Sequence, residues 1–199
     1  YMPALPMVLV NGTEGIGTGF SCYVPPFNPK DISTNILNFI SGKGIQRMKP
    51  WFRGFKGRVF YENDTWVTEG IWKVTSHGIK VTELPPGRWT QDYKEHLDTL
   101  TVGKDLIKDL KLQKTVRTSN MHLFHPTKGI HKYDSAELIL MDFIKLRHEY
   151  YIKRKAHLIK VFQAKVDMHS HRAKFVTMVI NGTLTVFKRK KRDLEVELS

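Results

Sequence analysis

The segment 135–168 contains neither glycine nor proline, and it constrains the fold more than any other part of the chain. Apolar side chains recur within it at Ile139, Phe143, Leu146 and Tyr150, which are four, three and four positions apart. That spacing places them in one narrow stripe along a helix, as in a coiled-coil seam. Because helices in globular proteins usually run for roughly 8 to 20 residues, the sequence predicts an unusually long helix that serves as a strut or a coiled-coil arm.

Between residues 55 and 84 the pattern changes to short runs rich in β-branched and aromatic residues, separated by turn residues. These runs cover 55–61, 65–75 and 79–84 and predict a three-stranded antiparallel meander. A further strand is predicted around 121–124. Sheet and long helix together predict an α+β fold.

Two shorter helices are predicted from their start signals. Asn28 is a good N-cap and Pro29 suits the first helical position, so one helix should begin there and end before Gly42. Another should begin at Thr90. The apolar stretch 175–180 fits a helix and a hairpin equally well.

The charge of the chain favours a polyanionic partner. Lysine and arginine total 32 against 19 aspartate and glutamate residues, a formal net charge of +13, and such a surface attracts nucleic acid. No apolar run approaches the ~20 residues needed to span a bilayer, so no membrane partner is predicted. The single Cys22 cannot form an internal disulfide, which indicates a reducing compartment.

A glycine-rich segment between positions 11 and 19 is the first candidate site. A dinucleotide-binding loop would need a helix to start inside the motif, but Pro25 and Pro26 follow instead. The plain alternative is a tight structural turn. A β-branched apolar residue between glycines on a loop of a basic protein favours a wedge that enters a base step and kinks the duplex. The DNA-binding candidates here are Asn11, Gly15, Ile16, Gly17 and Thr18.

A second candidate segment alternates cations with aromatic residues and glycines from 49 to 58. Cations among aromatic rings suit contact with the DNA backbone better than base readout. The alternative is a set of core aromatic residues with solvated charges between them. The candidates for phosphate contact are Lys49, Arg53, Lys56 and Arg58.

The nine histidines do not predict a metal site. The tightest pairs, His122 with His125 and His169 with His171, lack both the HExxH frame and a cysteine partner. Solvated or hydrogen-bonded histidines are the better interpretation. The sequence also contains no Asp-x-Asp and no Arg-Tyr.

Residues 1–19 are similar to the segment of type IIA DNA topoisomerases that follows the winged-helix domain. Further matching motifs extend the resemblance over nearly the whole chain, and they look like the eukaryotic rather than the bacterial branch. These motifs are Pro25 to Pro29, Pro50 to Gly54, Glu83 to Pro85, Arg88 to Gln91, Tyr93 to Glu95 and Lys132 to Asp134.

The resemblance implies three regions. Residues 1–27 would hold the end of the winged-helix region and the wedge, 28–134 a tower domain with an antiparallel sheet, and 135–199 the long helix and the base of a coiled coil. Ile16 would insert into a bent duplex, while positions near Arg53 and Lys56 would contact its backbone.

The resemblance also implies partners and cofactors. The full-length enzyme would be a homodimer on double-stranded DNA that uses ATP and Mg2+, and this fragment would bind neither cofactor. A cellular member of the family would be nuclear, and a viral one would act in the host cytoplasm.

No catalytic residue is predicted. The family's nucleophilic tyrosine follows an arginine and its metal-binding acids include an Asp-x-Asp, and neither pattern is present. The chain is expected to be an excised fragment, inactive alone, with a family segment missing between Leu110 and Lys111. Two alternatives stay open: a basic coiled-coil dimerisation module with incidental DNA binding, and an independent hydrolase that uses the histidines.

Overall fold

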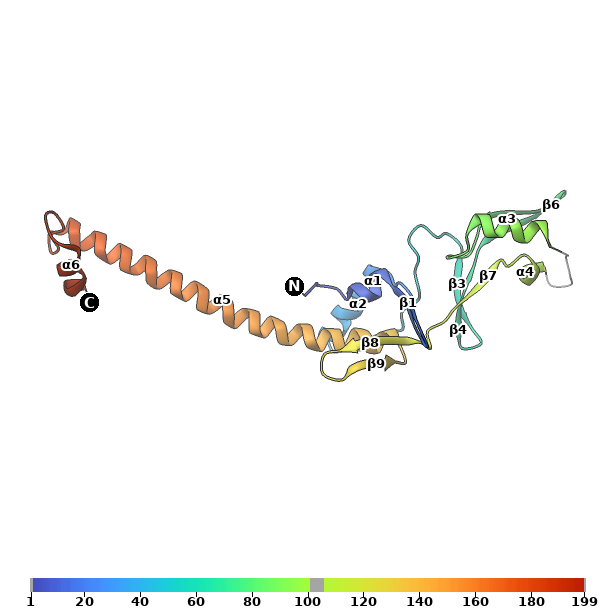
Figure 1. The fold of residues 1–199 in the computed structure, drawn as a ribbon, viewed down its shortest axis with the longest axis horizontal. Coiled ribbons are helices and arrows are strands. Elements are labelled where there is room, and N and C mark those ends of the chain that lie inside the picture. Colours follow the sequence, from blue (N-terminus) through green and yellow to red (C-terminus); the bar gives the residue numbers. More distant parts are fainter. Residues whose placement is uncertain (1, 101–105, 199) are drawn as a thin grey trace. The chain divides into compact units, whose positions relative to one another are not determined.

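The computed structural model describes residues 2–100 and 106–198. The chain divides into two compact units, Tyr1–Arg147 and His148–Ser199, and each is described by itself. Figure 1 shows the order of the helices and strands along the chain. The predicted mixture of helices and antiparallel sheets is confirmed, and so is a long helix in the C-terminal part of the chain.

The glycine-rich segment is a β-hairpin rather than a loop. Helix α1 (Met7–Asn11) is followed by strands β1 (Thr13–Gly17) and β2 (Phe20–Val24), which pair antiparallel around a two-residue turn. Gly12 connects α1 to β1 with a φ of +70°, and a Cβ there would lie 2.8 Å from the carbonyl oxygen of Val24. The glycines hide the strand from sequence analysis because they contribute no alternating pattern of side chains.

Helix α2 (Pro29–Ile40) begins where its start signals predict. The side chain of Asn28 accepts a hydrogen bond from the backbone N–H of Lys30 at 2.9 Å, which satisfies one of the free donors at the helix start. Farther along α2, the buried Asn35 exchanges two 2.9 Å hydrogen bonds with the backbone of Gln46. These bonds hold the chain after α2 against the helix.

The prediction of a three-stranded meander is wrong in its pairing. Strands β3 (Arg58–Glu62) and β4 (Thr65–Glu69) pair with β7 (Gln113–Val116), whereas β5 (Ile71–Thr75) and β6 (Gly78–Glu83) form a separate two-stranded sheet. The predicted run 65–75 therefore divides at Gly70, whose Cβ would lie 2.1 Å from the carbonyl oxygen of Glu83. Only glycine allows that close approach of two backbones.

The remaining elements of the first unit are two helices and a second hairpin. Helix α3 (Thr90–Asp98) and strand β8 (Met121–His125) match the prediction. The short helix α4 (Leu106–Asp109) and strand β9 (Gly129–Tyr133) were not predicted. Leu110 and Lys111, where a family segment is expected to be missing, form the turn between α4 and β7, and Lys111 has a positive φ of 47°.

The hydrophobic core of the first unit draws on two separate stretches of the chain. One stretch supplies α1, α2 and the residues around them, and the other supplies β8, β9 and the start of the long helix α5 (Ala136–Ile180). The buried members are Leu9, Val24, Phe27, Ile32, Met48, Met121, Tyr133, Ala136, Ile139, Leu140 and Ile144. The sheets between residues 58 and 116 contribute none of them.

The predicted helical seam is partly a core contact. Ile139 is buried in the hydrophobic core and Phe143 and Leu146 are half-buried, whereas Tyr150 is exposed. The start of α5 therefore packs within its own unit. The long helix itself is confirmed and extends beyond the predicted range to Ile180.

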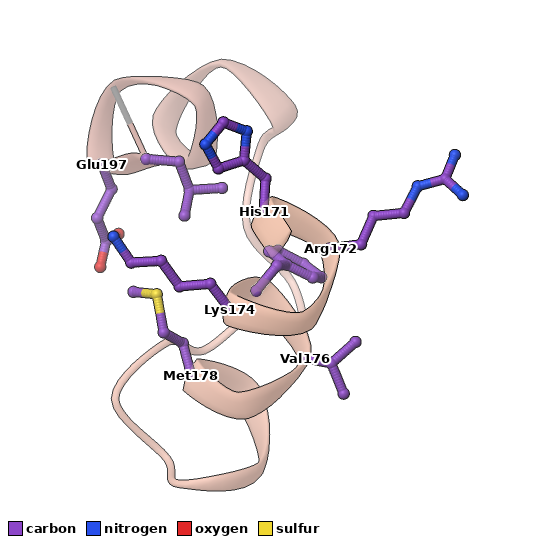
Figure 2. A pocket seen from close by; sticks show the side chains of 8 residues that line it. His171, Arg172, Lys174, Val176, Met178 and Glu197 are labelled. Carbon is purple, nitrogen blue, oxygen red and sulfur yellow. The ribbon is translucent and has the colours of Figure 1, made fainter. Parts of the chain in front are cut away.

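In the second unit, α5 is followed by a turn and helix α6 (Lys191–Leu198). The stretch 175–180 is helical, and Leu184 after the turn is buried. Figure 2 shows a hollow between α5 and α6, where Lys174 and Met178 point to the side of Glu197 while Arg172 and Val176 point away. Among the described residues no helix is long and apolar enough to cross a bilayer.

Candidate nucleic-acid interface

Ile16 stands out from the β1–β2 hairpin. Its side chain is 85% exposed, and all five residues of β1 are exposed. Across the hairpin it pairs with Ser21, and a Cβ added to the neighbouring Gly15 would meet nothing within 4 Å. A bare backbone beside an exposed aliphatic side chain is the shape that a wedge between base pairs requires.

Hydrogen bonds attach the hairpin to β8 and to the segment that leads into it. The backbone N–H of Tyr23 donates to the carbonyl oxygen of Asn120 at 2.9 Å. The Sγ of Cys22 donates to the carbonyl oxygen of His122 at 2.9 Å, and Nδ2 of Asn120 donates to Oγ of Ser21 at 2.5 Å. Strand β2 is therefore joined to residues a hundred positions later, which fixes the direction in which Ile16 points.

Two hollows meet at Ile16, and they differ in chemistry. We call one the basic hollow, because Lys114 and Arg117 line it together with Ile16. We call the other the apolar hollow, because Phe124 and Ile130 line it with Ile16 and none of its described lining residues is Asp, Glu, Lys or Arg. Phe124 and Ile130 are cross-strand partners on β8 and β9, 84% and 70% exposed.

The predicted residues of the glycine-rich segment lie together and are accessible. Gly15, Ile16 and Gly17 belong to β1, Thr18 belongs to the turn, and Asn11 ends α1. All five are exposed. The hairpin thus presents them as one projecting element.

The predicted phosphate contacts Lys49, Arg53, Lys56 and Arg58 lie on a different part of the chain. All four are exposed. The segment that carries them is attached near the hairpin, since the N–H of Trp51 donates to the carbonyl oxygen of Pro26 at 2.8 Å. The chain then continues into β3. The structure therefore joins the two candidate segments through their backbones, near Pro26 and Trp51, and does not gather their predicted side chains into one cluster.

Arg58 is engaged within the protein. Its Nη2 lies 3.0 Å from Oε1 of Glu69, and Gln113 donates to Oε2 of the same carboxylate at 2.8 Å. Burial acts to raise the pKa of Glu69, but the hydrogen bonds from Gln113 and Arg58 and the attraction of the guanidinium outweigh it and hold the pKa below its usual value. The ion pair stabilises the β3–β4–β7 sheet. A phosphate that bound Arg58 would share its guanidinium with the carboxylate of Glu69.

Lys114, Arg117 and Asn120 have positions at the hairpin that the sequence analysis missed. Lys114 is on β7, and Arg117 and Asn120 lie in the connection to β8. Each borders a hollow that Ile16 also borders. Isolated cations in a polar stretch form no recognisable sequence pattern. Only the hydrogen bonds between β2 and the residues around Asn120 could have identified them.

His125 contacts an aspartate of the long helix α5. His125 Nε2 lies 3.5 Å from Oδ2 of Asp142, and the Tyr133 hydroxyl donates to the same oxygen at 3.1 Å. Burial, followed by the hydrogen bond and charge of Asp142, raises the pKa of Tyr133 to about 12. No group of three or more His, Cys, Asp or Glu side chains that could hold a metal ion occurs in the described part of the chain.

Relatives of known sequence match the whole chain. DNA topoisomerase 2 of Arabidopsis thaliana is 37% identical over 238 aligned residues, and the enzymes of Pisum sativum and Saccharomyces cerevisiae are each 34% identical. Each match covers 100% of this chain but 16% of the relative. The chain has 199 residues, so the 238-residue alignments with the two plant enzymes include at least 39 positions that it lacks.

A solved structure has the same fold. The crystal structure of the Plasmodium falciparum topoisomerase II DNA-binding, cleavage and re-ligation domain superimposes with a TM-score of 0.87 at 34% identity, over 100% of this chain and 32% of that one. The model of the DNA gyrase/topoisomerase IV A-subunit family matches residues 1–108 and 99–199. The resemblance predicted from the motifs is thereby confirmed, and the chain belongs to this family of type IIA DNA topoisomerases.

Proposed function

We propose that this chain is a DNA-holding part of a type IIA topoisomerase that grips a duplex through its phosphates and kinks it with Ile16. The observation that carries the proposal is the 85% exposure of Ile16 on a hairpin whose base is held by hydrogen bonds. The net charge of +13 supplies the attraction for a polyanion. The structural relative is itself named a DNA-binding, cleavage and re-ligation domain.

The wedge mechanism follows from where the hairpin is exposed. Gly15 and Gly17 leave the backbone of β1 without side chains on either side of Ile16, so base pairs could approach it closely. Insertion unstacks one base step at a cost of about a few kcal/mol, and the bend then lets more of the protein contact phosphate. Asn11 and Thr18 flank the wedge, and Lys49, Arg53, Lys56 and Arg58 would contact the backbone away from it.

DNA bending tests the proposal directly. A short duplex labelled at both ends should show higher energy transfer when this chain binds, and Ile16→Ala should reduce that rise at saturating protein. Val74→Ala is a matched control, because Val74 on β5 is a β-branched side chain of similar exposure, 73%. Equal energy transfer for Ile16→Ala and the unchanged chain would refute the wedge.

Salt dependence separates this function from the coiled-coil alternative. A surface with ~6 to 10 phosphate contacts should lose about three to five decades of affinity between 50 and 200 mM salt. A dimerisation module with incidental DNA binding should lose much less and should instead self-associate. Self-association is favoured by one observation: Ile152, Ile159 and Val166 are exposed and lie seven residues apart on α5.

The chain spans 16% of the length of the curated relatives named above, and the activity of the whole protein is therefore a proposal. The whole enzyme would be a homodimer that passes one duplex through a transient double-strand break in another. ATP and Mg2+ would serve its other parts. The described side chains offer no donor set that fits Mg2+, so we assign no step of that chemistry to this chain.

The region boundaries and the source belong to the same proposal. Residues 1–27 would carry the wedge, 28–134 the tower domain, and 135–199 the long helix and base of the coiled coil. The residues of the motifs are similar to those of the topoisomerase of African swine fever virus, which supports a viral origin and action in the host cytoplasm. A cellular member would act in the nucleus.

A further inference from the structure

Arg47 lies over two aromatic rings of the β3–β4 hairpin. Its Cζ is 3.7 Å from the ring centroid of Tyr61 and 5.4 Å from that of Trp66. Tyr61 and Trp66 are direct cross-strand partners, and their rings meet edge to face with centroids 5.2 Å apart. These three side chains form one cluster, which we call the arginine stack.

The backbone of Arg47 is held on both sides. Gln46 exchanges its two backbone hydrogen bonds with the side chain of Asn35 on α2. The N–H of Met48 donates to Oε1 of Glu137 on α5 at 2.7 Å, and the Met48 side chain is buried in the core. Because the rings also restrict the side chain of Arg47, much of the rotamer entropy that an arginine loses on binding a ligand is already lost.

Stacking leaves the hydrogen-bond donors of Arg47 available. A guanidinium is planar and carries five N–H donors in that plane, whereas a ring beneath it covers a flat face. Arg47 is exposed and Tyr61 is 42% exposed, so a ligand can reach the stack from solvent. The edge of the guanidinium is therefore suited to a group with two adjacent oxygen atoms, such as a phosphate.

No carboxylate neutralises Arg47 within residues 2–100 and 106–198, where the salt bridges involve other cations. The hairpin does contain Glu62 and Asp64. Glu62 follows Tyr61 directly in β3, so its side chain lies on the opposite face of the sheet. Asp64 lies in the turn between β3 and β4. Arg47 thus offers a full positive charge on the face that carries the two rings.

Arg58 shows the contrast on the other face of the same sheet. Its Nη2 is paired with Glu69 at 3.0 Å, and its Cζ is 5.7 Å from the ring of Phe60. Arg58 therefore stacks less closely than Arg47 and shares its charge with a carboxylate. Of these two arginines, Arg47 is the better ligand for an anion.

We propose that Arg47 binds a backbone phosphate of the bound duplex, and that Tyr61 and Trp66 are positioning residues that hold its guanidinium ready. The proposal rests on the proposed function and adds a contact outside the candidate segments. The exposed Lys49 and Arg53 follow in the same stretch of chain, and a polyanion with regularly spaced phosphates can engage several such cations at once.

The salt dependence of duplex affinity tests the contact. Arg47→Gln should reduce the slope of log affinity against log salt by about 0.9, the value for one lost phosphate contact. Arg47→Lys and Tyr61→Leu should keep the slope but weaken affinity by about two- to thirtyfold, because charge remains while the stack is lost. The matched control is Lys73→Gln, which removes an exposed cation from the separate β5–β6 sheet and should keep both slope and affinity.

Nuclear magnetic resonance of isotope-labelled arginine side chains distinguishes a phosphate contact from a purely structural stack. The ring current of Tyr61 should shift the Nε–H signal of Arg47 upfield in the free chain, and Arg47→Lys assigns the signal by removing it. Duplex binding should shift the signal downfield, because a charge-assisted hydrogen bond deshields the proton. Thermal unfolding should show that each variant is folded.

Two results would overturn the proposal. One is an Arg47 signal that stays unchanged on duplex binding, together with an unchanged salt slope in Arg47→Gln, which would make the stack structural only. The other is a signal that moves with polyglutamate but not with duplex, which would assign the stack to an acidic protein partner.

The wedge and the arginine stack fail in different ways. If Ile16→Ala leaves bending unchanged while duplex moves the Arg47 signal and Arg47→Gln lowers the slope, the wedge is wrong and the phosphate contact stands. If Ile16→Ala reduces bending while the Arg47 signal and slope stay unchanged, the wedge stands and the phosphate contact is wrong. A chain that bound no duplex would refute both.

Discussion

The hydroxyl of Tyr133 donates a hydrogen bond to Oδ2 of Asp142 at 3.1 Å and so links β9 to the first turns of α5. Because the pKa of Tyr133 is raised to about 12, its contribution to stability is complete below the usual pKa of 10 and is lost as the pH rises toward 12. Tyr133→Phe should remove that loss, on the order of 2–3 kcal/mol. Urea unfolding at pH 9 to 12 measures it.

Asp142→Asn is the companion variant for this prediction. It keeps a polar group near the hydroxyl but removes the charge that helps to raise the pKa of Tyr133. The alkaline loss should then still begin near the usual pKa of 10, but it should end at a lower pH and be smaller than in the unchanged chain. An identical alkaline profile in all three proteins would contradict the assignment to Tyr133.

The pair of Arg58 and Glu69 predicts the response to acid. The pKa of Glu69 is lowered in the folded chain, so its stabilising effect is present above the usual value of 4.5 and is lost as the pH falls through the folded pKa. Arg58→Gln should raise that pKa toward 4.5, so the acid loss of stability should be smaller and should be complete at a higher pH. At neutral pH the cost should be about 1 kcal/mol, because Arg58 itself is largely exposed.

Acid unfolding followed by circular dichroism checks the Arg58 prediction. Lys73→Gln serves as the control, since it removes an exposed cation from β5 without touching Glu69. If the two variants unfolded at the same pH, the lowered pKa of Glu69 could not depend on Arg58.

Gly12 and Gly15 should differ in their tolerance of a side chain. At Gly12 the φ of +70° and the approach of Val24 oxygen to 2.8 Å from an added Cβ leave no room, so Gly12→Ala should destabilise the chain by on the order of 2–4 kcal/mol. Gly15→Ala meets nothing within 4 Å and should change stability little. Chemical denaturation of both variants measures the difference, and equal effects would count against the described turn.

Truncation of two isoleucines should change stability to very different extents. Ile32 is fully buried in the core, so Ile32→Ala should cost about 2–5 kcal/mol. Ile16 is exposed, so Ile16→Ala should stay within about 0.5 kcal/mol of the unchanged chain. A large loss of stability at Ile16 would mean that its side chain packs against protein and is not free to meet DNA.

The sequence reveals the elements whose signals are local. The N-cap at Asn28, the start of α3 at Thr90 and the Gly- and Pro-free helix after residue 135 are each determined by neighbours in the sequence, and each prediction matches the structure. Strand partners are not local. The division at Gly70 depends on a contact with Glu83, and the third strand of the sheet, β7, comes from residues that carry no strand pattern of their own.

The candidate site divides in the same way. The glycine-flanked Ile16 is identifiable because an apolar residue between glycines is unusual on a surface, and the structure places it in solvent. Lys114 and Arg117 carry no such mark, and only the hydrogen bonds of Asn120 with β2 bring them to the wedge. The DNA contacts themselves remain predictions.

The two-part origin of the core governs how the chain folds. Its buried residues end at Met48 and resume at Met121. During synthesis the core cannot form until the residues from Met121 onward have been made. Such distant contacts slow folding, because the entropy cost of closing a long loop comes before the free energy gained by burying apolar side chains. The intervening β3–β4–β7 sheet can assemble earlier as a separate nucleus, and its completion shortens the effective loop that the two halves of the core must close.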